Sequence, residues 1–161
     1  MTGADPGKLT LMGRFNFYSS TYLGGVARFY ARVHRRLYTR FGGTRFATLF
    51  GDPVFELTVP GRKSGEPRPV MLMLVRSGDD LLVCGSNGGN PGVPNWWKNL
   101  LATDKAWVRI GRESFPVTYR VVTDSAEYDA HWRTLAATYP HFDTYRALSP
   151  RQFPIAVLSR A

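Results

Sequence analysis

The octapeptide GRKSGEPR, residues 61–68, combines three cationic side chains with two glycines. Arg62, Lys63 and Arg68 supply full positive charges, and the glycines permit backbone conformations that bring the main chain close to a ligand. Backbone N–H groups in such a turn can form a concave anion-binding nest. Because apolar runs stand on both sides, PVFELTV and PVMLMLV, the cations lie where two predicted strands meet. The octapeptide indicates a phosphate or carboxylate site, with a solvated basic hairpin turn as the alternative.

The net charge of +9 is concentrated in the first third of the chain. Residues 1–51 hold eight of the 21 Lys and Arg residues but only one of the 12 Asp and Glu residues. A basic segment on a nearly neutral remainder predicts an acidic partner: a polyanionic small molecule, an anionic membrane surface or nucleic acid. No apolar run approaches the roughly 20 residues of a transmembrane helix, and no signal peptide is recognisable. We expect a cytoplasmic protein, with peripheral contact to the inner face of the plasma membrane as a further option.

Cysteine and histidine are too sparse for the common metal sites. The single cysteine, Cys84, lies in the apolar run LLVCGS, and the three histidines are scattered. A lone cysteine in a buried strand is typical of an inert core thiol, whereas metal sites need several ligands at close spacing. The sequence therefore predicts no metal and no internal disulfide.

Hydrophobic periodicity divides the chain into an N-terminal part and a β-rich remainder. Residues 1–23 lack a clear period and read as an arm without fixed structure. Apolar residues at helical spacing predict an amphipathic helix over 24–41, whose other faces carry arginine. Six strands are predicted after it: 54–59, 69–75, 81–86, 106–110, 115–122 and 154–159. Helices are expected at 95–103, from 124 to about 139, and in a short turn over 141–148.

The predicted strands are short and mostly joined by tight turns, which favours antiparallel pairing. A parallel doubly wound sheet would need a crossover helix between most consecutive strands, and the spacing leaves no room for them. We therefore predict a single domain over 1–161 of the mainly β or α+β class. Its centre would be a six-stranded antiparallel sheet closed into a split β-barrel, with helices flanking it.

Four segments together resemble one protein family: GRKSGEPR, the strand end CGSNGG (84–89), the helix start NWWKNL (95–100) and the tract YPHFDTY (139–145). Their order and spacing over roughly residues 35–161 resemble the deazaflavin-dependent nitroreductase family, the A group of flavin/deazaflavin oxidoreductases. The resemblance implies a split β-barrel that binds coenzyme F-420, a deazaflavin with a phosphodiester and a poly-γ-glutamate tail. Such an anionic tail agrees with the cationic octapeptide.

The resemblance assigns cofactor contacts to four segments. The tail would be held in the turn by Arg62, Lys63, Ser64 and Arg68. The ring system would lie on the following strand, at Pro69, Val70, Met71, Leu72 and Met73. The ring edge would be passed by Cys84, Gly85, Ser86 and Asn87. The helix start would complete the site with Asn95, Trp96, Trp97, Lys98 and Asn99. Of the two tryptophans, the first is expected in the cofactor or substrate wall and the second in the core.

Substrate contacts are expected from Ser86, Trp96, Tyr139, Phe142 and Tyr145. In the resembling enzymes three tyrosines at this i, i+3, i+6 spacing roof the substrate pocket, whereas the middle residue here is phenylalanine. The family also often has lysine where this chain has asparagine at position 87. The implied reaction is hydride transfer from reduced coenzyme F-420 to a quinone, an enone or a nitroaromatic compound. The candidate catalytic hydroxyls are those of Ser86, Tyr139 and Tyr145, which could meet negative charge on the acceptor oxygen.

Two other functions stay open at this stage. One is an FMN-binding split-barrel oxidoreductase, and the other is a basic nucleic-acid-binding module built on the helix 24–41. The chain lacks an RNA-binding aromatic motif or a zinc knuckle, so we expect no nucleic-acid partner. The helix 24–41 would be either a packed helix with a solvated cationic face or a helix lying on an anionic membrane.

Overall fold

The computed structural model describes residues 52–161 continuously, together with residues 48–49 and isolated positions before them. Most of the predicted arm 1–23 and most of the predicted helix 24–41 lie outside the described residues. Leu11, Arg14 and Phe15 of the arm are described as helical and exposed, which differs from the expected absence of fixed structure. Five described helical positions fall within 24–41: Val33, Arg36 and Arg40 are exposed, Leu37 is half-buried and Tyr38 is fully buried. The Tyr38 hydroxyl accepts a hydrogen bond from the Gly111 amide at 3.1 Å, which attaches this position to the turn that contains Gly111.

Short strands make up much of the described chain. Their bounds are β1 (Thr48–Leu49), β2 (Asp52–Pro60), β3 (Pro67–Met73), β4 (Val75–Ser77), β5 (Asp80–Cys84), β6 (Ala106–Ile110), β7 (Glu113–Val121) and β8 (Ile155–Arg160). The helices are the 3-10 helix η2 (Asn87–Gly89) and the α-helices α3 (Asn95–Leu100), α4 (Ser125–Thr138) and α5 (His141–Leu148). All six predicted strands are present. The predicted strand 69–75 is divided at Leu74 into β3 and β4, and the two-residue β1 was not predicted.

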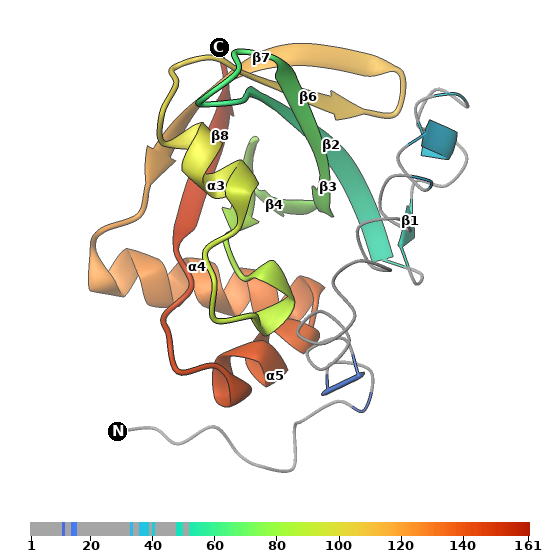
Figure 1. Cartoon of the computed structure of the whole chain (residues 1–161). Helices are drawn as coiled ribbons and strands as arrows, with labels where there is room; N and C mark the ends of the chain where they lie inside the picture. Colours follow the sequence, from blue (N-terminus) through green and yellow to red (C-terminus); the bar gives the residue numbers. More distant parts are fainter. Residues whose placement is uncertain are drawn as a thin grey trace.

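Every strand pairing is antiparallel, and the order is β1-β2-β6-β7-β8-β5-β4 with β3 on the other edge of β2. Only Leu74 separates β3 from β4, yet β3 pairs with β2 and β4 pairs with β5. One continuous segment therefore joins the two ends of the sheet, which curls into a barrel (Figure 1). The predicted antiparallel split barrel is confirmed, with more strands than the six expected.

Two hydrophobic cores follow from the alternation of side chains along the strands. In β5, Leu81 and Val83 face the first core, whereas Leu82 and Cys84 face the second. The first core fills the barrel with residues such as Phe55, Leu57, Val59, Val108, Val117 and Leu158. Burial of each such side chain contributes about 1.5–3 kcal/mol to folding.

The second core lies between the sheet and the helices α4 and α5, which pack together on one side of the barrel (Figure 1). Trp132 and Leu135 of α4 are buried there together with Phe153. Helix α4 ends at Thr138, since Pro140 disfavours a helical conformation at the residue before it. Tyr139 accordingly adopts an extended conformation as the C-cap residue, which places it at the junction of α4 and α5. Among the described residues, no helix has the length and apolar character needed to cross a membrane.

Candidate functional site

A cavity of about 450 Å³ opens where the β2–β3 turn faces α3. This size is typical of a small-molecule site. The residues lining it are Gly61, Arg62, Lys63, Ser64, Arg68, Pro69, Val70, Asn95, Trp96 and Asn99. All of these except Gly61 are residues that the sequence predicts to bind the cofactor. Gly61 is not among the residues predicted to bind the cofactor. Glycine is nevertheless the residue type that fits at position 61, because a Cβ atom would lie 2.8 Å from the Ser64 Oγ.

Several backbone amides of the turn already bond within the protein, which leaves few main-chain donors for the predicted anion nest. The Gly61 N–H donates to the Glu66 carbonyl, and the N–H groups of Ser64 and Gly65 both donate to the Gly61 carbonyl. Gly65 has a φ of 69°, which this tight turn requires and which glycine adopts without strain. Because these main-chain donors are already used, an anion at this turn would be bound mainly by side chains.

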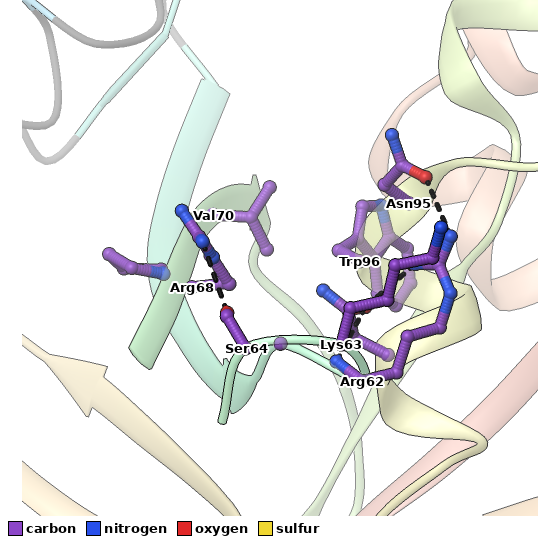
Figure 2. A pocket seen from close by; sticks show the side chains of 10 residues that line it. Arg62, Lys63, Ser64, Arg68, Val70, Asn95 and Trp96 are labelled. Carbon is purple, nitrogen blue, oxygen red and sulfur yellow. Dashed lines mark hydrogen bonds between the residues drawn. The ribbon is translucent and has the colours of Figure 1, made fainter. Parts of the chain in front are cut away.

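Arg62 joins the turn to α3. Its Nη1 donates to the Asn99 Oδ1 at 2.8 Å, and its Nη2 lies 3.4 Å from the Asn95 Oδ1. The Arg62 main-chain N–H donates to the same Asn99 oxygen at 3.3 Å. Figure 2 shows the side chain extending from the turn to Asn95. Asn99 is buried, so Arg62 satisfies a polar group inside the protein and fixes the position of the turn against the helix.

The other two cations, Lys63 and Arg68, have no partner of opposite charge among the described residues. The Arg68 Nη2 donates to the neutral Ser64 Oγ at 3.1 Å, and the side chain bends back over the turn (Figure 2). In the described part of the chain, no carboxylate forms an ion pair with Lys63 or Arg68. Two uncompensated positive charges at a cavity wall attract an anionic ligand.

β3 presents an open edge that begins at this cavity. In an antiparallel pair, alternate residues direct both backbone polar groups to the partner strand. The Leu74 N–H donates to the Pro53 carbonyl at 2.8 Å, which fixes the alternation: residues 68, 70 and 72 bond to β2. Residues 67, 69, 71 and 73 therefore direct their backbone groups to the other edge, where no described strand pairs.

Only two N–H donors face this open edge of β3. Residues 67 and 69 are prolines, which have no N–H. Met71 and Met73 each offer one N–H and one carbonyl. A planar ligand with alternating acceptors and donors along one side could pair with these two residues as a neighbouring strand would.

Three of the five predicted substrate residues gather at the far end of β3. Tyr139, Phe142 and Tyr145 are buried in the second core, and Met73 packs against the same core. The hydroxyls of Tyr139 and Tyr145 are 3.3 Å apart, close enough to share a hydrogen bond. The Phe142 ring packs edge-on against both, with ring centroids 5.2 and 6.2 Å away. Since a strand rises about 3.3 Å per residue, β3 spans roughly 17 Å from Arg68 to Met73. It links the cationic cavity to the tyrosine cluster, defined here as Tyr139, Phe142 and Tyr145.

The predicted residues of β5 and the loop after it lie outside the cavity. Cys84 is buried, and this burial raises the pKa of its thiol to about 12. It is protonated at neutral pH, as expected for a core thiol and not for a nucleophile. Ser86 is buried ahead of η2, and the Asn87 side-chain amide donates to the Gly92 carbonyl at 2.9 Å. Asn87 therefore supports its own loop. Gly85 packs closely between Trp97 and Pro154.

The paired tryptophans of α3 face different surroundings. Trp96 lines the cavity, whereas Trp97 is buried in the first core. Their rings meet edge-on with centroids 5.5 Å apart. Lys98, which the sequence assigned to the cofactor, is exposed and does not line the cavity. The remaining predicted strand residues, Met71, Leu72 and Met73, are half-buried beyond the cavity wall.

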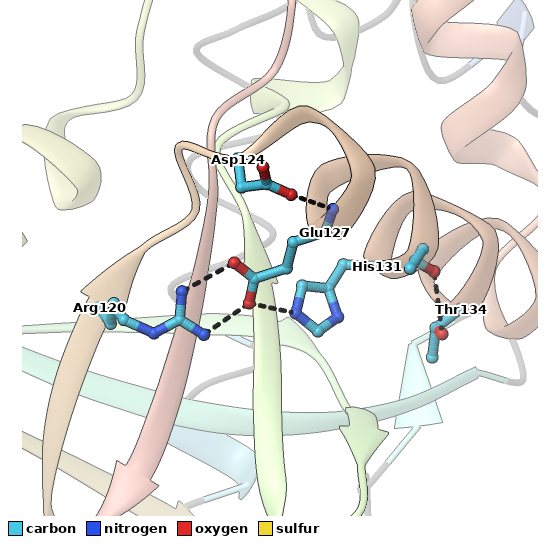
Figure 3. Close-up of polar contacts among 6 residues, drawn as sticks. Arg120, Asp124, Glu127, His131 and Thr134 are labelled. Atoms are coloured by element: carbon cyan, nitrogen blue, oxygen red, sulfur yellow. Dashed lines mark hydrogen bonds and ion pairs between the residues drawn. The ribbon is translucent and has the colours of Figure 1, made fainter.

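A polar cluster fixes α4, and with it Tyr139, to β7 (Figure 3). Arg120 of β7 binds both carboxylate oxygens of Glu127, at 2.9 and 2.5 Å. The His131 Nε2 lies 3.2 Å from the same carboxylate, and Asp124 caps the helix by accepting from the Glu127 N–H. Hydrogen bonding from Arg120 lowers the pKa of Glu127 to about 2.

Comparison with known proteins gives a family and a fold. The profile of the family described as F420H(2)-dependent quinone reductase matches residues 30–160. A protein named F420H(2)-dependent quinone reductase from Mycobacterium tuberculosis strain H37Rv is 29% identical over 132 residues, covering 80% of this chain and 89% of that protein.

Two solved structures agree with this family assignment and with the fold. One, titled as an F420-H2 dependent reductase (FDR-A), has 29% identity and a TM-score of 0.61, covering 66% of this chain and 94% of its own. Another, described as a domain-swapped dimer, has 26% identity and a TM-score of 0.64. The match covers 84% of this chain and 99% of that structure's chain. The matched range 30–160 includes every residue of the cavity and of the tyrosine cluster.

The Glu127 cluster predicts an acid-dependent loss of stability. The pKa of Glu127 in the folded state, about 2, lies below its usual value of 4.5. Its contribution to stability is therefore complete above about pH 4.5 and is lost as the pH falls toward 2. We expect Glu127→Gln to unfold at a lower temperature than the parent protein at pH 7, with the difference shrinking between pH 5 and pH 3. Thermal unfolding across this pH range measures the difference in unfolding temperature.

Glu66→Gln is the control, because Glu66 is exposed and forms no ion pair with a described residue. A constant difference between Glu127→Gln and the parent would contradict the prediction.

Proposed function

The chain belongs to the F420H(2)-dependent quinone reductase family, and from this premise we propose that the cavity, the open edge of β3 and the tyrosine cluster form one site for hydride transfer to a quinone. The family assigns coenzyme F-420 as the cofactor, as the sequence motifs predicted, and leaves FMN as the alternative only. One observation carries the placement of the site. Two cations without a described partner of opposite charge stand at one end of a strand edge that no described strand occupies, and buried tyrosines stand at the other end.

The cationic end suits the acidic tail of coenzyme F-420. Lys63 and Arg68 would bind its phosphate and carboxylates, with Ser64 adding a hydroxyl. Charge-assisted hydrogen bonds of this kind contribute about 1.5–3 kcal/mol each. Arg62 would act differently from the sequence-based expectation, because its bonds to Asn95 and Asn99 already give it a structural task. It would hold the turn so that the other two cations face the ligand.

The open edge of β3 suits the ring system. One side of a deazaflavin ring carries alternating carbonyl and N–H groups. The backbone groups of Met71 and Met73 offer the complementary N–H and carbonyl groups along an edge that no described strand occupies. Trp96 would form a wall on the α3 side. The donors are backbone atoms of a strand paired along its whole length with β2, so they are held in place before the ligand arrives.

When bound, the reduced coenzyme supplies the hydride. The protein would orient the quinone and exclude water from it. Hydride addition to a quinone places negative charge on an oxygen, and one further proton completes the hydroquinone. The hydroxyls of Ser86, Tyr139 and Tyr145 are the candidates to stabilise that oxygen. A hydroxyl that accepts a hydrogen bond while donating another is a stronger donor, and the 3.3 Å contact between the two tyrosines would provide this effect.

Enones and nitroaromatic compounds are further candidate acceptors. They share with quinones an electron-poor centre conjugated to oxygen, so the same hydroxyls could meet the developing charge. Phe142 stands where the resembling enzymes have the middle tyrosine, and it removes one donor from the tyrosine cluster. We expect this loss to weaken nitro reduction more than quinone reduction, because a nitro group develops charge on two oxygens.

Neutralising the two uncompensated cations should weaken binding of coenzyme F-420. Lys63→Met and Arg68→Met are each expected to raise its dissociation constant by about 10- to 100-fold, because each removes a charge-assisted contact. Fluorescence quenching during titration measures the constant. Lys105→Met, an exposed lysine away from the cavity, is the matched control. The deazaflavin chromophore with its ribityl chain, but without phosphate or tail, should bind parent and variants alike. An unchanged constant for coenzyme F-420 in the folded double variant would refute the tail site.

Removing the candidate hydroxyls should slow the reduction of the quinone. Tyr139→Phe, Tyr145→Phe and Ser86→Ala are each expected to lower kcat by about 10-fold or more, with little change in the dissociation constant of coenzyme F-420. Steady-state kinetics with a soluble naphthoquinone separates the two effects. If none of the three substitutions alters turnover, the assignment of these hydroxyls to the acceptor oxygen is wrong.

The basic segment supports the further proposal that the protein binds an anionic membrane surface and reduces lipid-soluble quinones there. Arg36 and Arg40 are exposed, and five arginines lie between residues 28 and 40. An anionic membrane surface attracts such a cluster by about 1 kcal/mol per residue near the surface. Replacing these five arginines by glutamine should abolish flotation with vesicles that contain anionic lipid. Neutral vesicles are the control, and equal flotation of parent and variant would remove the segment as an anchor.

A further inference from the structure

One side chain outside the cavity organises the loop that carries Ser86. Arg151 lies between α5 and β8, and its Nη2 is 2.9 Å from the Gly85 carbonyl and 3.0 Å from the Ser86 carbonyl. The same Nη2 lies 3.4 Å from the Gly92 carbonyl, and the Nε donates to the Asn90 carbonyl at 3.1 Å. Four carbonyl oxygens of residues 85–92 therefore converge on one guanidinium group.

The surroundings of Arg151 keep its guanidinium in place. The guanidinium carbon lies 4.5 Å from the centroid of the Phe153 ring, which is fully buried. The Arg151 Nη1 is buried and has no hydrogen-bond partner among the described residues. No described carboxylate forms an ion pair with this arginine. Its charge is balanced by carbonyl dipoles of the loop, so the loop and the guanidinium stabilise each other.

The backbone of this loop is one that few sequences adopt unaided. Asn87, Gly88 and Gly89 have φ angles of 54°, 64° and 85°, a run of three left-handed residues. Two short bonds within the loop assist: the Asn87 amide donates to the Gly92 carbonyl, and the Gly92 N–H donates to Asn90. Asparagine tolerates this region only moderately, so the run needs outside support.

The loop connects the two halves of the proposed site. Ser86 stands at its start, and two residues after its end the chain enters α3, which carries Trp96. Helix η2 packs against α5, which carries Phe142 and Tyr145. A shift of residues 85–92 would therefore move Ser86 and the start of α3 relative to the tyrosine cluster.

We propose that Arg151 is a positioning residue that holds Ser86 and α3 in register with the tyrosine cluster by binding the carbonyls of residues 85–92. The inference rests on the proposed function, since it concerns the acceptor half of that site. Arg151 acts through the loop and not on the tail cations, which belong to the β2–β3 turn. Its removal should impair reduction of the quinone strongly and affect binding of the coenzyme much less, because Arg62 still holds α3 to the β2–β3 turn through Asn95 and Asn99.

The test uses Arg151→Met in the full chain, with Arg133→Met as the matched control, since Arg133 is exposed on α4. With a soluble naphthoquinone, Arg151→Met is expected to lower kcat/KM by about 10- to 100-fold, because small displacements of positioned groups carry such losses. The dissociation constant of coenzyme F-420 should stay within about threefold, while added guanidinium ion should restore part of the turnover of Arg151→Ala. Hydrogen exchange of amides 85–92 should be faster in Arg151→Met, with the core strands unchanged.

A folded Arg151→Met protein with parental kcat/KM, or with parental exchange in residues 85–92, would overturn the inference. If Arg151→Met does not fold, Arg151→Lys decides. A lysine has the charge but cannot bridge four carbonyls, so a partial loss supports the inference and parental kinetics overturn it. Failure of the proposed function looks different: the parent protein itself would then show no reduction of the quinone by the reduced coenzyme. The exchange measurement needs no cofactor, and unchanged exchange would refute the carbonyl contacts in either case.

Discussion

The segment from Pro67 to Ser77 cannot pair with the same neighbour along its whole length. It bonds to β2 as far as Met73 and to β5 from Val75 onward, with Leu74 at the change. This change closes the barrel, and it also leaves the second edge of β3 without a described partner strand. An unpaired edge in a protein invites pairing with another strand. Prolines at 67 and 69 remove two of its donors, so that the remaining N–H groups, at Met71 and Met73, form a short patch suited to a small planar ligand.

The role of each charged side chain around this edge follows from the group to which it is bonded. Arg62 is bound to α3 through Asn99 and fixes the shape of the cavity. Arg68 is bound only to a neutral hydroxyl, and Lys63 has no partner of opposite charge in the described structure. At the other end of β3, Glu127 and Arg120 secure the helix whose C-cap is Tyr139. Each end of the proposed site is thus held by an ion pair or a charged hydrogen bond that is not itself used for binding.

The sequence predicted the strands and the cationic turn well, because both depend on local patterns. Alternating apolar residues mark β2 and β7, a continuous apolar run marks β5, and Asp124 with Pro140 marks the ends of α4. The sequence did not predict those features that depend on contacts between residues far apart in the chain. Nothing local to GRKSGEPR shows that its amides bond within the turn or that Arg62 reaches Asn99. The division at Leu74 depends on two different partner strands. The role of Arg151 depends on a loop about 60 residues away. Family resemblance brought Ser86 and Tyr139 into one hypothesis, which residue patterns alone would not have done.

The most direct measurement is a crystal structure of the full chain with coenzyme F-420 bound. The account predicts that the phosphate and at least one tail carboxylate lie within hydrogen-bonding distance of Lys63 and Arg68. It also predicts that the polar side of the ring pairs with the backbone of Met71 and Met73, between Trp96 and the tyrosine cluster. A coenzyme bound elsewhere, or one whose ring does not touch the open edge of β3, would contradict it.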